Sequence, residues 1–189
     1  MKCFTPELYV QGQSREDEVL DRAHEEWERA NQRYLKQYRR IERELPAALR
    51  RFHDEQCLHD AEWCGMAPWP VTMPASDAQC VAIIVRQDNT LIPQFLNTLA
   101  VLQYVITAPP VIERPVEDFF RDVRPVWLYE EVDLIGPGVF SHSILLSNGL
   151  VVTIQFREFS YHIAPLLDPG PKQLAKARRA AMGHGRTSA

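Results

Sequence analysis

A charged segment with a single apolar stripe, running from Ser14 to Leu45, constrains the fold more than any other feature of the chain. Its apolar residues recur every three or four positions, the spacing of one face of an α-helix. They are Leu20, Ala23, Trp27, Ala30, Tyr34, Tyr38, Ile41 and Leu45. The Ser14 hydroxyl can cap this helix, and acidic residues follow in its first turn, at the positive end of the helix dipole. The sequence therefore predicts a helix roughly 45 Å long, which is more than a small sheet covers.

A second helix and a run of strands are predicted after the first helix. Pro46 suits the first turn of a helix, and the apolar face continues through Leu49 and Phe52 to about Glu55. The pattern then favours strands, because segments rich in β-branched and aromatic residues alternate with Pro, Gly, Asn and Asp. These segments are 57–63, 79–86, 98–106, 126–134, 139–146 and 150–156. We expect an α+β fold in which a long N-terminal helix and a second helix pack on an antiparallel β-sheet.

The length and composition predict one domain with a substantial core. The chain has 189 residues, of which 46% are hydrophobic, including 8 Phe, 6 Tyr and 4 Trp. From Pro165 the sequence becomes rich in Pro and Gly and then basic, which is typical of a disordered tail. We expect a single α+β domain over 1–164 and a basic, disordered tail over 165–189.

Charge and hydropathy argue against several classes of partner and location. The net charge of −4 and the pI near 5.9 do not supply the broad positive field that nucleic-acid binding requires. No stretch has the apolar length of a signal peptide core or of a membrane span. The four cysteines are irregularly spaced and suggest reduced thiols. We expect a cytoplasmic protein that binds neither nucleic acid nor membrane.

The turn at 147–149 is decided by strand register. A two-residue Asn-Gly loop would mix apolar and polar residues on both faces of the hairpin. A three-residue loop with Gly149 in the left-handed region instead gathers the apolar residues of both strands on one face. These residues are Phe140, Ile144, Leu146, Leu150, Val152, Ile154 and Phe156. This register predicts that His142 lies on the apolar face.

Two further polar residues interrupt apolar strand faces. The same alternation places Glu130 among Val126, Leu128, Val132 and Leu134, and it places His59 on an apolar face of segment 57–63. Buried charges need partners, so we expect His59, Glu130 and His142 to lie close together, with Glu130 bonded to His142 as one example. One interpretation is a structural hydrogen bond in the core; the other is a small acid/base or ligand-binding pocket with these three residues as catalytic candidates.

Four potential zinc ligands lie within twelve residues of the sequence. His53, Cys57, His59 and Cys64 form H-x3-C-x-H-x4-C, a suitable composition for zinc but a poor spacing, with no second pair downstream. No phosphate-binding loop, dinucleotide fingerprint or nucleophile elbow occurs. We therefore expect less than one zinc per chain and no cofactor.

Four segments together resemble an uncharacterised bacterial family of unknown function that opens with M-K-x-F-T-x-E-L-Y. They are residues 1–9, 58–61, 127–133 and 142–149. The resemblance implies a small bacterial cytosolic protein, and it supplies no activity, substrate or catalytic residue.

The hypothesis that best fits a motif-free helix-on-sheet protein is a non-catalytic binding or interaction module, such as an immunity-type or regulatory partner. A protein partner or self-association is expected. The alternatives are a small hydrolase or metal-dependent enzyme that uses the His/Glu cluster, and a homo-oligomeric structural protein. An overhanging helix would favour binding, and a concave pocket at the cluster would favour an enzyme.

Overall fold

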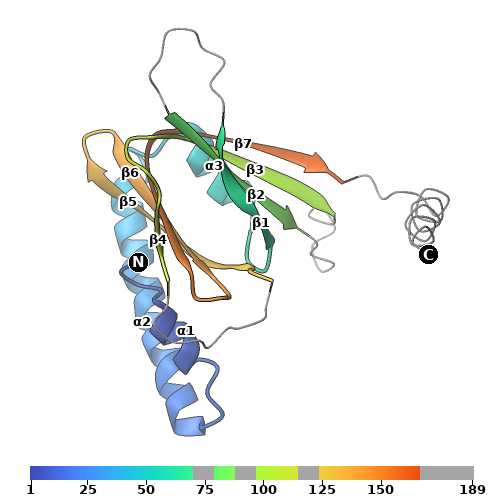
Figure 1. Cartoon of the computed structure of the whole chain (residues 1–189). Coiled ribbons are helices and arrows are strands. Elements are labelled where there is room, and N and C mark those ends of the chain that lie inside the picture. The colour runs from blue at the N-terminus through green and yellow to red at the C-terminus, as the bar shows by residue number, and fades with distance from the viewer. Residues whose placement is uncertain (70–78, 88–96, 115–123, 167–189) are drawn as a thin grey trace, which may run out of the picture.

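The computed structural model describes residues 1–69, 79–87, 97–114 and 124–166 (Figure 1). Three helices precede the strands: α1 (Pro6–Gln11), α2 (Asp17–Ile41) and α3 (Ala47–Glu55). The strands are β1 (Glu62–Trp69), β2 (Gln79–Gln87), β3 (Thr98–Ile106), β4 (Val111–Glu113), β5 (Trp127–Gly136), β6 (Val139–Leu146) and β7 (Val151–Pro165). The predicted α+β class with an antiparallel sheet is confirmed. The tail expected from residue 165 lies outside the described residues from 167 onward.

Helix α2 follows the predicted stripe but is shorter than expected at both ends. It begins at Asp17, because the Ser14 hydroxyl accepts the N–H of Glu16 (3.1 Å) in the preceding turn and not an N–H of the helix. It ends at Ile41, and a turn separates it from α3. Ala23, Ala30 and Ile41 are its buried residues, as the stripe predicts. Among the described helices, none is long and apolar enough to cross a membrane.

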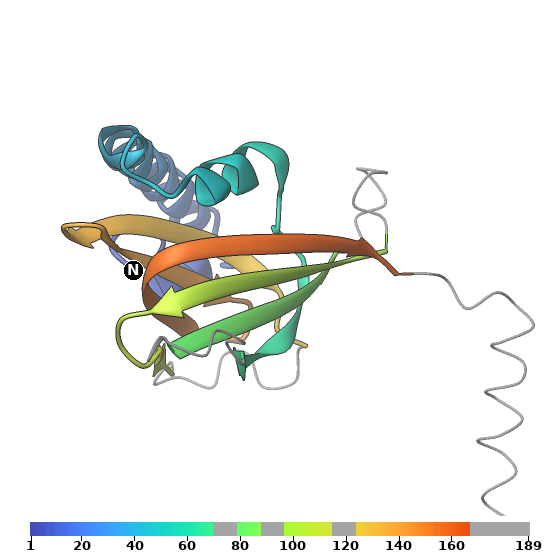
Figure 2. The same cartoon turned by 90° about the horizontal axis from the view of Figure 1, so that it is seen from above.

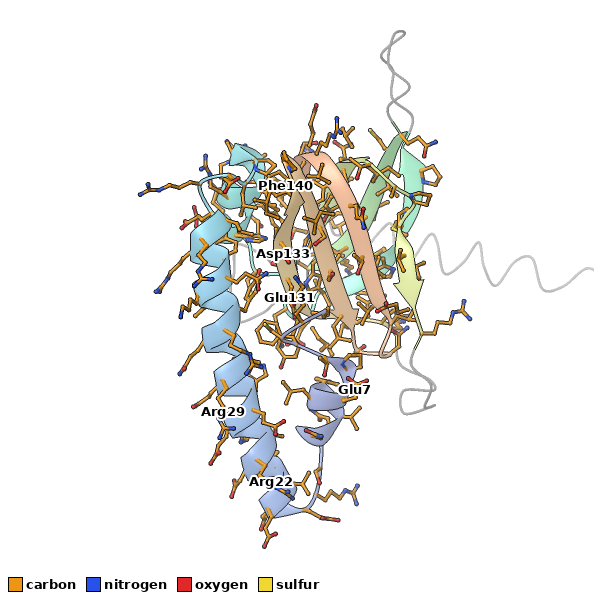
Figure 3. All side chains as sticks on the ribbon, turned by 90° about the vertical axis from the view of Figure 1, so that its left-hand side faces the viewer. Glu7, Arg22, Arg29, Glu131, Asp133 and Phe140 are labelled. Carbon is orange, nitrogen blue, oxygen red and sulfur yellow. The ribbon has the colours of Figure 1, made fainter. Side chains whose placement is uncertain are left out.

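The sheet does not cover the N-terminal part of the long helix, and a helix that the sequence did not reveal lies beside it. Figures 1 and 3 show α1 running next to the N-terminal part of α2, beyond the end of the sheet. Helix α1 starts at Pro6, and the Thr5 hydroxyl accepts the N–H of Leu8 (3.3 Å) as its cap. The overhanging part of α2 is therefore covered on one side by the chain's own N-terminal segment.

The strands form a seven-stranded antiparallel sheet in the order β1-β2-β3-β7-β6-β5, with β4 also paired to β7. The sheet curls until the start of β5 meets the segment before β1. Asp60 donates its N–H to the carbonyl of Trp127 (2.8 Å), and Trp127 donates its N–H to the carbonyl of Ala61 (2.9 Å). Strand β7 pairs with β6 through its first part and with β3 through its second part, so it links the two halves of the curl.

The main core fills the concave side of this curl, and α3 with the end of α2 closes it (Figure 2). Leu49 and Phe52 of α3 are completely or almost completely buried there. A smaller apolar cluster lies on the other face of β5 and β6, where Leu128, Leu145 and Val151 meet Met1 and Tyr9 of the N-terminal segment. Helices therefore cover the concave face of the sheet, and the N-terminal segment covers part of the other.

The register predicted for the hairpin of β6 and β7 is confirmed. His142 pairs with Ile154 and Ile144 pairs with Val152. Gly149 has a φ of 77°, the left-handed conformation that the three-residue loop needs. His142 consequently faces the main core.

Two strand predictions were wrong, and each error has a local cause. Residues 57–61 form no strand, because the chain turns at His59 and Asp60, where Asp60 has a φ of 66°, and β1 starts only at Glu62. In β5, a bulge between Trp127 and Tyr129 shifts the alternation. Trp127 therefore joins the main core and Leu128 the opposite cluster, whereas Glu130 and Val132 keep the predicted face.

Candidate functional site

Three residues from three elements meet where the helix layer lies on the sheet: His53 of α3, Glu130 of β5 and His142 of β6. His53 follows the buried Phe52 in α3, and its ring contacts those of Tyr38 in α2 and His142 in β6. The paired register of β5 and β6 places Glu130 opposite Ile144 and Val132 opposite His142 on the same face. Helix packing and strand pairing thus bring together residues that are 12 to 89 positions apart.

The predicted contact between Glu130 and His142 is present. The Oε2 atom of Glu130 lies 3.0 Å from Nε2 of His142. On the other side of the ring, Nδ1 lies 2.9 Å from the hydroxyl of Tyr104, which is fully buried in β3. A carboxylate only accepts hydrogen bonds, so Nε2 carries a proton, and a neutral ring then accepts the Tyr104 O–H at Nδ1. This chain of bonds fixes one tautomer of His142.

His53 is bonded on one side only. Its Nδ1 atom lies 3.2 Å from the hydroxyl of Tyr38 in α2, and the two rings stack with centroids 5.4 Å apart. Its Nε2 atom lies 3.5 Å from Oε1 of Glu130, yet it forms no hydrogen bond although it is buried. The cluster therefore contains one buried polar atom without a hydrogen-bond partner.

The electrostatics of the cluster follow from burial and from the short distances. Burial lowers the pKa of His53, although Glu130 acts in the opposite direction. Burial alone would raise the pKa of Glu130, but His53 and His142 outweigh it and hold this pKa below its ordinary value. Burial also raises the pKa of Tyr38 to about 12 and that of Tyr104 well above its usual range. At neutral pH Glu130 is thus a carboxylate, and both tyrosines are protonated.

Access to this cluster is limited. The side chain of His142 is 0% exposed, that of His53 13% and that of Glu130 26%. A cavity of about 480 Å³ in the described structure lies elsewhere, at the junction of β3 and β7, and its lining includes Gln79, Thr107 and Arg157. A substrate would reach only the exposed part of the Glu130 side chain, so the geometry gives little support to the hypothesis of an acid/base site.

His59 does not join Glu130 and His142. Its side chain is half exposed and lies 3.1 Å from the carboxylate of Asp60, with its ring against Tyr129 (centroids 5.8 Å apart). The prediction failed for this residue because it assumed a strand where the chain turns.

The four zinc candidates from the sequence are not gathered either. Cys57 and Cys64 are exposed, and the thiol of Cys64 contacts the carbonyl of Glu62. Of the four, only His53 belongs to a group of ligand atoms: one from each of His53, Glu130 and His142, all within 4.8 Å of one another. In the sequence His53 was a candidate for a different set of ligands, and Tyr38 and Tyr104 gave no sign of a polar role because they occupy ordinary apolar positions in their patterns.

A second buried carboxylate lies on the opposite face of β5. Oε1 of Glu131 accepts the N–H groups of Cys3 and Phe4, both at 2.7 Å, and Oε2 accepts the N–H of Lys2 at 2.8 Å. The ammonium group of Lys2 pairs with Asp133. Glu131 and Asp133, labelled in Figure 3, thus hold the N-terminal segment on the sheet.

The ring of Phe4, next in this segment, packs among aromatic rings from α2 and β5. Its centroid lies 5.2 Å from that of Tyr129, 5.6 Å from that of Tyr34 and 6.1 Å from that of Trp27. These contacts pack the N-terminal segment against α2 and β5, beside the Glu131 carboxylate, both of whose oxygens accept hydrogen bonds from the segment.

Comparisons with known proteins add no functional assignment. No family model, curated protein or solved structure matches the chain. The resemblance of residues 1–9 and the three other segments to a bacterial family therefore stays a prediction, and the function is argued from the site and the surface alone.

Proposed function

We propose that the protein is a non-catalytic binding module whose protein partner docks on the outward face of the second half of α2. The observation that carries this proposal is a set of cations without ion-pair partners. They are Lys36, Arg39, Arg40 and Arg43, all exposed and none in an ion pair within the described residues. An acidic protein surface is the partner chemistry that fits them.

The helix dipole accounts for part of this charge. It favours cations in the last turn of a helix, where Arg39 and Arg40 lie. Lys36 precedes that turn, and Arg43 follows the end of the helix. The first half of α2 has the opposite character, with exposed acids at Glu18, Asp21, Glu25, Glu26 and Glu28. The cations of the proposed surface thus lie in the second half of α2 and the turn after it, and a molecule of net charge −4 offers them to a local partner, not to a long polyanion.

The position of the His/Glu cluster also supports the proposal, because it argues against the enzyme alternative. An enzyme needs its acid and base within reach of a substrate. Here the reactive atoms of His53, Glu130 and His142 face one another under α2 and α3. The hydrolase alternative therefore has its residues, but their reactive atoms face one another instead of a cavity described for the structure, and the surface of α2 becomes the better-supported site of action.

The proposal is tested by capture and direct binding with charge-reversed variants. The test variant carries Arg39→Glu, Arg40→Glu and Arg43→Glu. The matched control carries Arg15→Glu, Arg22→Glu and Arg29→Glu, an equal change of charge on and just before the same helix; Figure 3 labels Arg22 and Arg29. We expect a protein that the wild type and the control both capture, and that the test variant loses.

The captured protein is then purified and its dissociation constant measured at low and high salt. For an acidic partner, binding weakens as salt increases. Equal capture by the test variant and wild type would contradict the proposed surface. Loss of capture with a Glu130→Gln variant that retains its fold would instead favour the cluster as the site of action.

A further inference from the structure

One buried atom in the His/Glu cluster has no hydrogen-bond partner, which indicates a place for a ligand. Nε2 of His53 is shielded from solvent and makes no hydrogen bond, while Nδ1 of the same ring is engaged by Tyr38. Buried nitrogen and oxygen atoms in folded proteins nearly always have a partner, and exceptions point to a missing water or ion. Oε1 of Glu130 lies 3.5 Å from this nitrogen. If Nδ1 holds the ring proton, two lone pairs face each other there, and a cation between them removes the repulsion.

The distances in the cluster match the spacing of ligands around a small metal ion. Zinc holds imidazole nitrogen and carboxylate oxygen at about 2.0 to 2.2 Å, so tetrahedral ligand atoms lie about 3.4 Å apart. Nε2 of His53 lies 3.5 Å from Oε1 of Glu130, and Nε2 of His142 lies 3.0 Å from Oε2, the other oxygen of the same carboxylate. All three ligand atoms lie within 4.8 Å of one another. A small shift of the side chains is enough to bring them onto one ion.

The outer contacts of the two histidines are those of metal ligands. A histidine that binds a metal through one nitrogen usually has its other nitrogen held by a hydrogen-bonding partner, which fixes the ring. Both rings here turn Nε2 inward and Nδ1 to a tyrosine hydroxyl: Tyr38 for His53 and Tyr104 for His142. An ion that binds Nε2 of His142 displaces the proton held there, and the ring then carries its proton on Nδ1 and donates it to the oxygen of Tyr104. The two histidine–tyrosine pairs come from different elements of the fold, and the ring nitrogens have the same roles in both.

We propose that His53, Glu130 and His142 bind one divalent transition-metal ion, with Tyr38 and Tyr104 holding the two imidazole rings. Two imidazoles and one carboxylate suit zinc and its neighbours Co²⁺, Ni²⁺ and Fe²⁺, and they do not form the all-oxygen set that Mg²⁺ and Ca²⁺ prefer. Water completes the coordination on the side where Glu130 is partly exposed. The ion ties α3 to β5 and β6, a role different from that of the exposed cations of α2.

The test uses the full chain, free of any affinity tag and stripped with a chelator, and measures titration with Zn²⁺ and with Co²⁺. We expect one ion per chain, a higher melting temperature with zinc, and a cobalt spectrum without a thiolate band. Glu130→Gln and His53→Gln should each weaken zinc binding at least about a hundredfold, since each removes one of three ligands. Tyr38→Phe should weaken it about tenfold, because it touches only the outer partner of His53.

Control variants are Cys57→Ser, Cys64→Ser and His59→Ala, which alter the zinc candidates that the fold does not gather. They should keep full stoichiometry and the same cobalt spectrum. A wild-type chain that binds less than a tenth of an equivalent and gains no thermal stability overturns the proposal. So does a thiolate band, or zinc that is lost with Cys57→Ser. Circular dichroism of each stripped variant separates loss of the site from loss of the fold.

Discussion

Glu130 and Glu131 are consecutive residues of β5, and their carboxylates have opposite environments because successive side chains of a strand point to opposite faces. The carboxylate of Glu131 accepts three backbone N–H groups and is complete within the chain. The carboxylate of Glu130 receives one hydrogen bond from His142 and lies beside a nitrogen of His53 that has none. A buried charge that its own chain satisfies is a structural device, whereas one with an unsatisfied neighbour indicates a place for a ligand.

The largest loss of stability is expected from substitution of Glu131, whose carboxylate has all its hydrogen-bond donors within the chain. Glu131→Ala leaves the N–H groups of Lys2, Cys3 and Phe4 without their acceptor, two of them in buried bonds. Each unsatisfied buried donor costs about 1 to 3 kcal/mol, so the free energy of unfolding should fall by about 3 kcal/mol or more. Urea unfolding monitored by circular dichroism measures it.

Two controls separate this effect from the rest of the molecule. Glu131→Gln keeps an acceptor oxygen and should lose clearly less stability than Glu131→Ala. The loss in Glu131→Ala should also be the same with zinc and with chelator. If zinc rescues the variant, the two faces of β5 are coupled and the comparison fails.

The next largest loss of stability is expected from substitution of Glu130, on the opposite face of β5. In metal-free protein, Glu130→Ala removes the acceptor of His142 and should lower the free energy of unfolding by about 1 to 3 kcal/mol. An unchanged denaturant midpoint would mean that Glu130 is solvated. Replacing His142 and Tyr104 with Phe, together with Glu130→Met, removes the bonds among these three residues and should restore most of the loss, as apolar replacements of similar volume for buried polar groups often do.

Two tyrosine hydroxyls give a further contrast, because one is bonded to the backbone of β5 and the other to a histidine of the His/Glu cluster. The hydroxyl of Tyr34 accepts the N–H of Val132 (3.1 Å) near the N-terminal segment, and that of Tyr104 bonds to His142. Tyr34→Phe and Tyr104→Phe should each lower the free energy of unfolding by about 1 kcal/mol. Only Tyr104→Phe should also weaken zinc binding, measured by calorimetric titration. Equal zinc affinities would remove Tyr104 from the proposed metal site.

Periodic elements of the fold were predictable from the sequence, and irregular ones were not. The buried stripe of α2, the bounds of β3 and β6, and the register of the hairpin at Gly149 follow from spacing and turn chemistry. The turn at Asp60 and the bulge in β5 were missed, since each depends on pairing with a segment remote in sequence. The length of β7 was underestimated because its second half pairs with β3, which precedes it by more than forty residues.

The candidate site was predictable in part for the same reason. Glu130 and His142 interrupt apolar strand faces, and this interruption was sufficient to predict their contact. His53 lies on a helix, where a histidine beside a buried phenylalanine breaks no pattern. Tyr38 and Tyr104 fit their apolar faces, and only their hydroxyls, aimed at ring nitrogens of His53 and His142, reveal a polar role.

The smallest effect is expected at Lys2, at the rim of the complete side. Its ammonium group pairs with Asp133, but the side chain is 71% exposed, and exposed ion pairs contribute about 0.2 to 1 kcal/mol at most. Lys2→Ala keeps the backbone N–H that Glu131 accepts, so the main attachment of the N-terminal segment remains. The free energy of unfolding should change by less than about 0.5 kcal/mol, and the small difference from wild type should disappear at high salt because salt screens exposed charges. Urea unfolding at low and high salt measures both quantities. A loss as large as that of Glu131→Ala would show that the side chain of Lys2, and not the carboxylate of Glu131, holds the segment in place, and the contrast between the two faces of β5 would then need a different explanation.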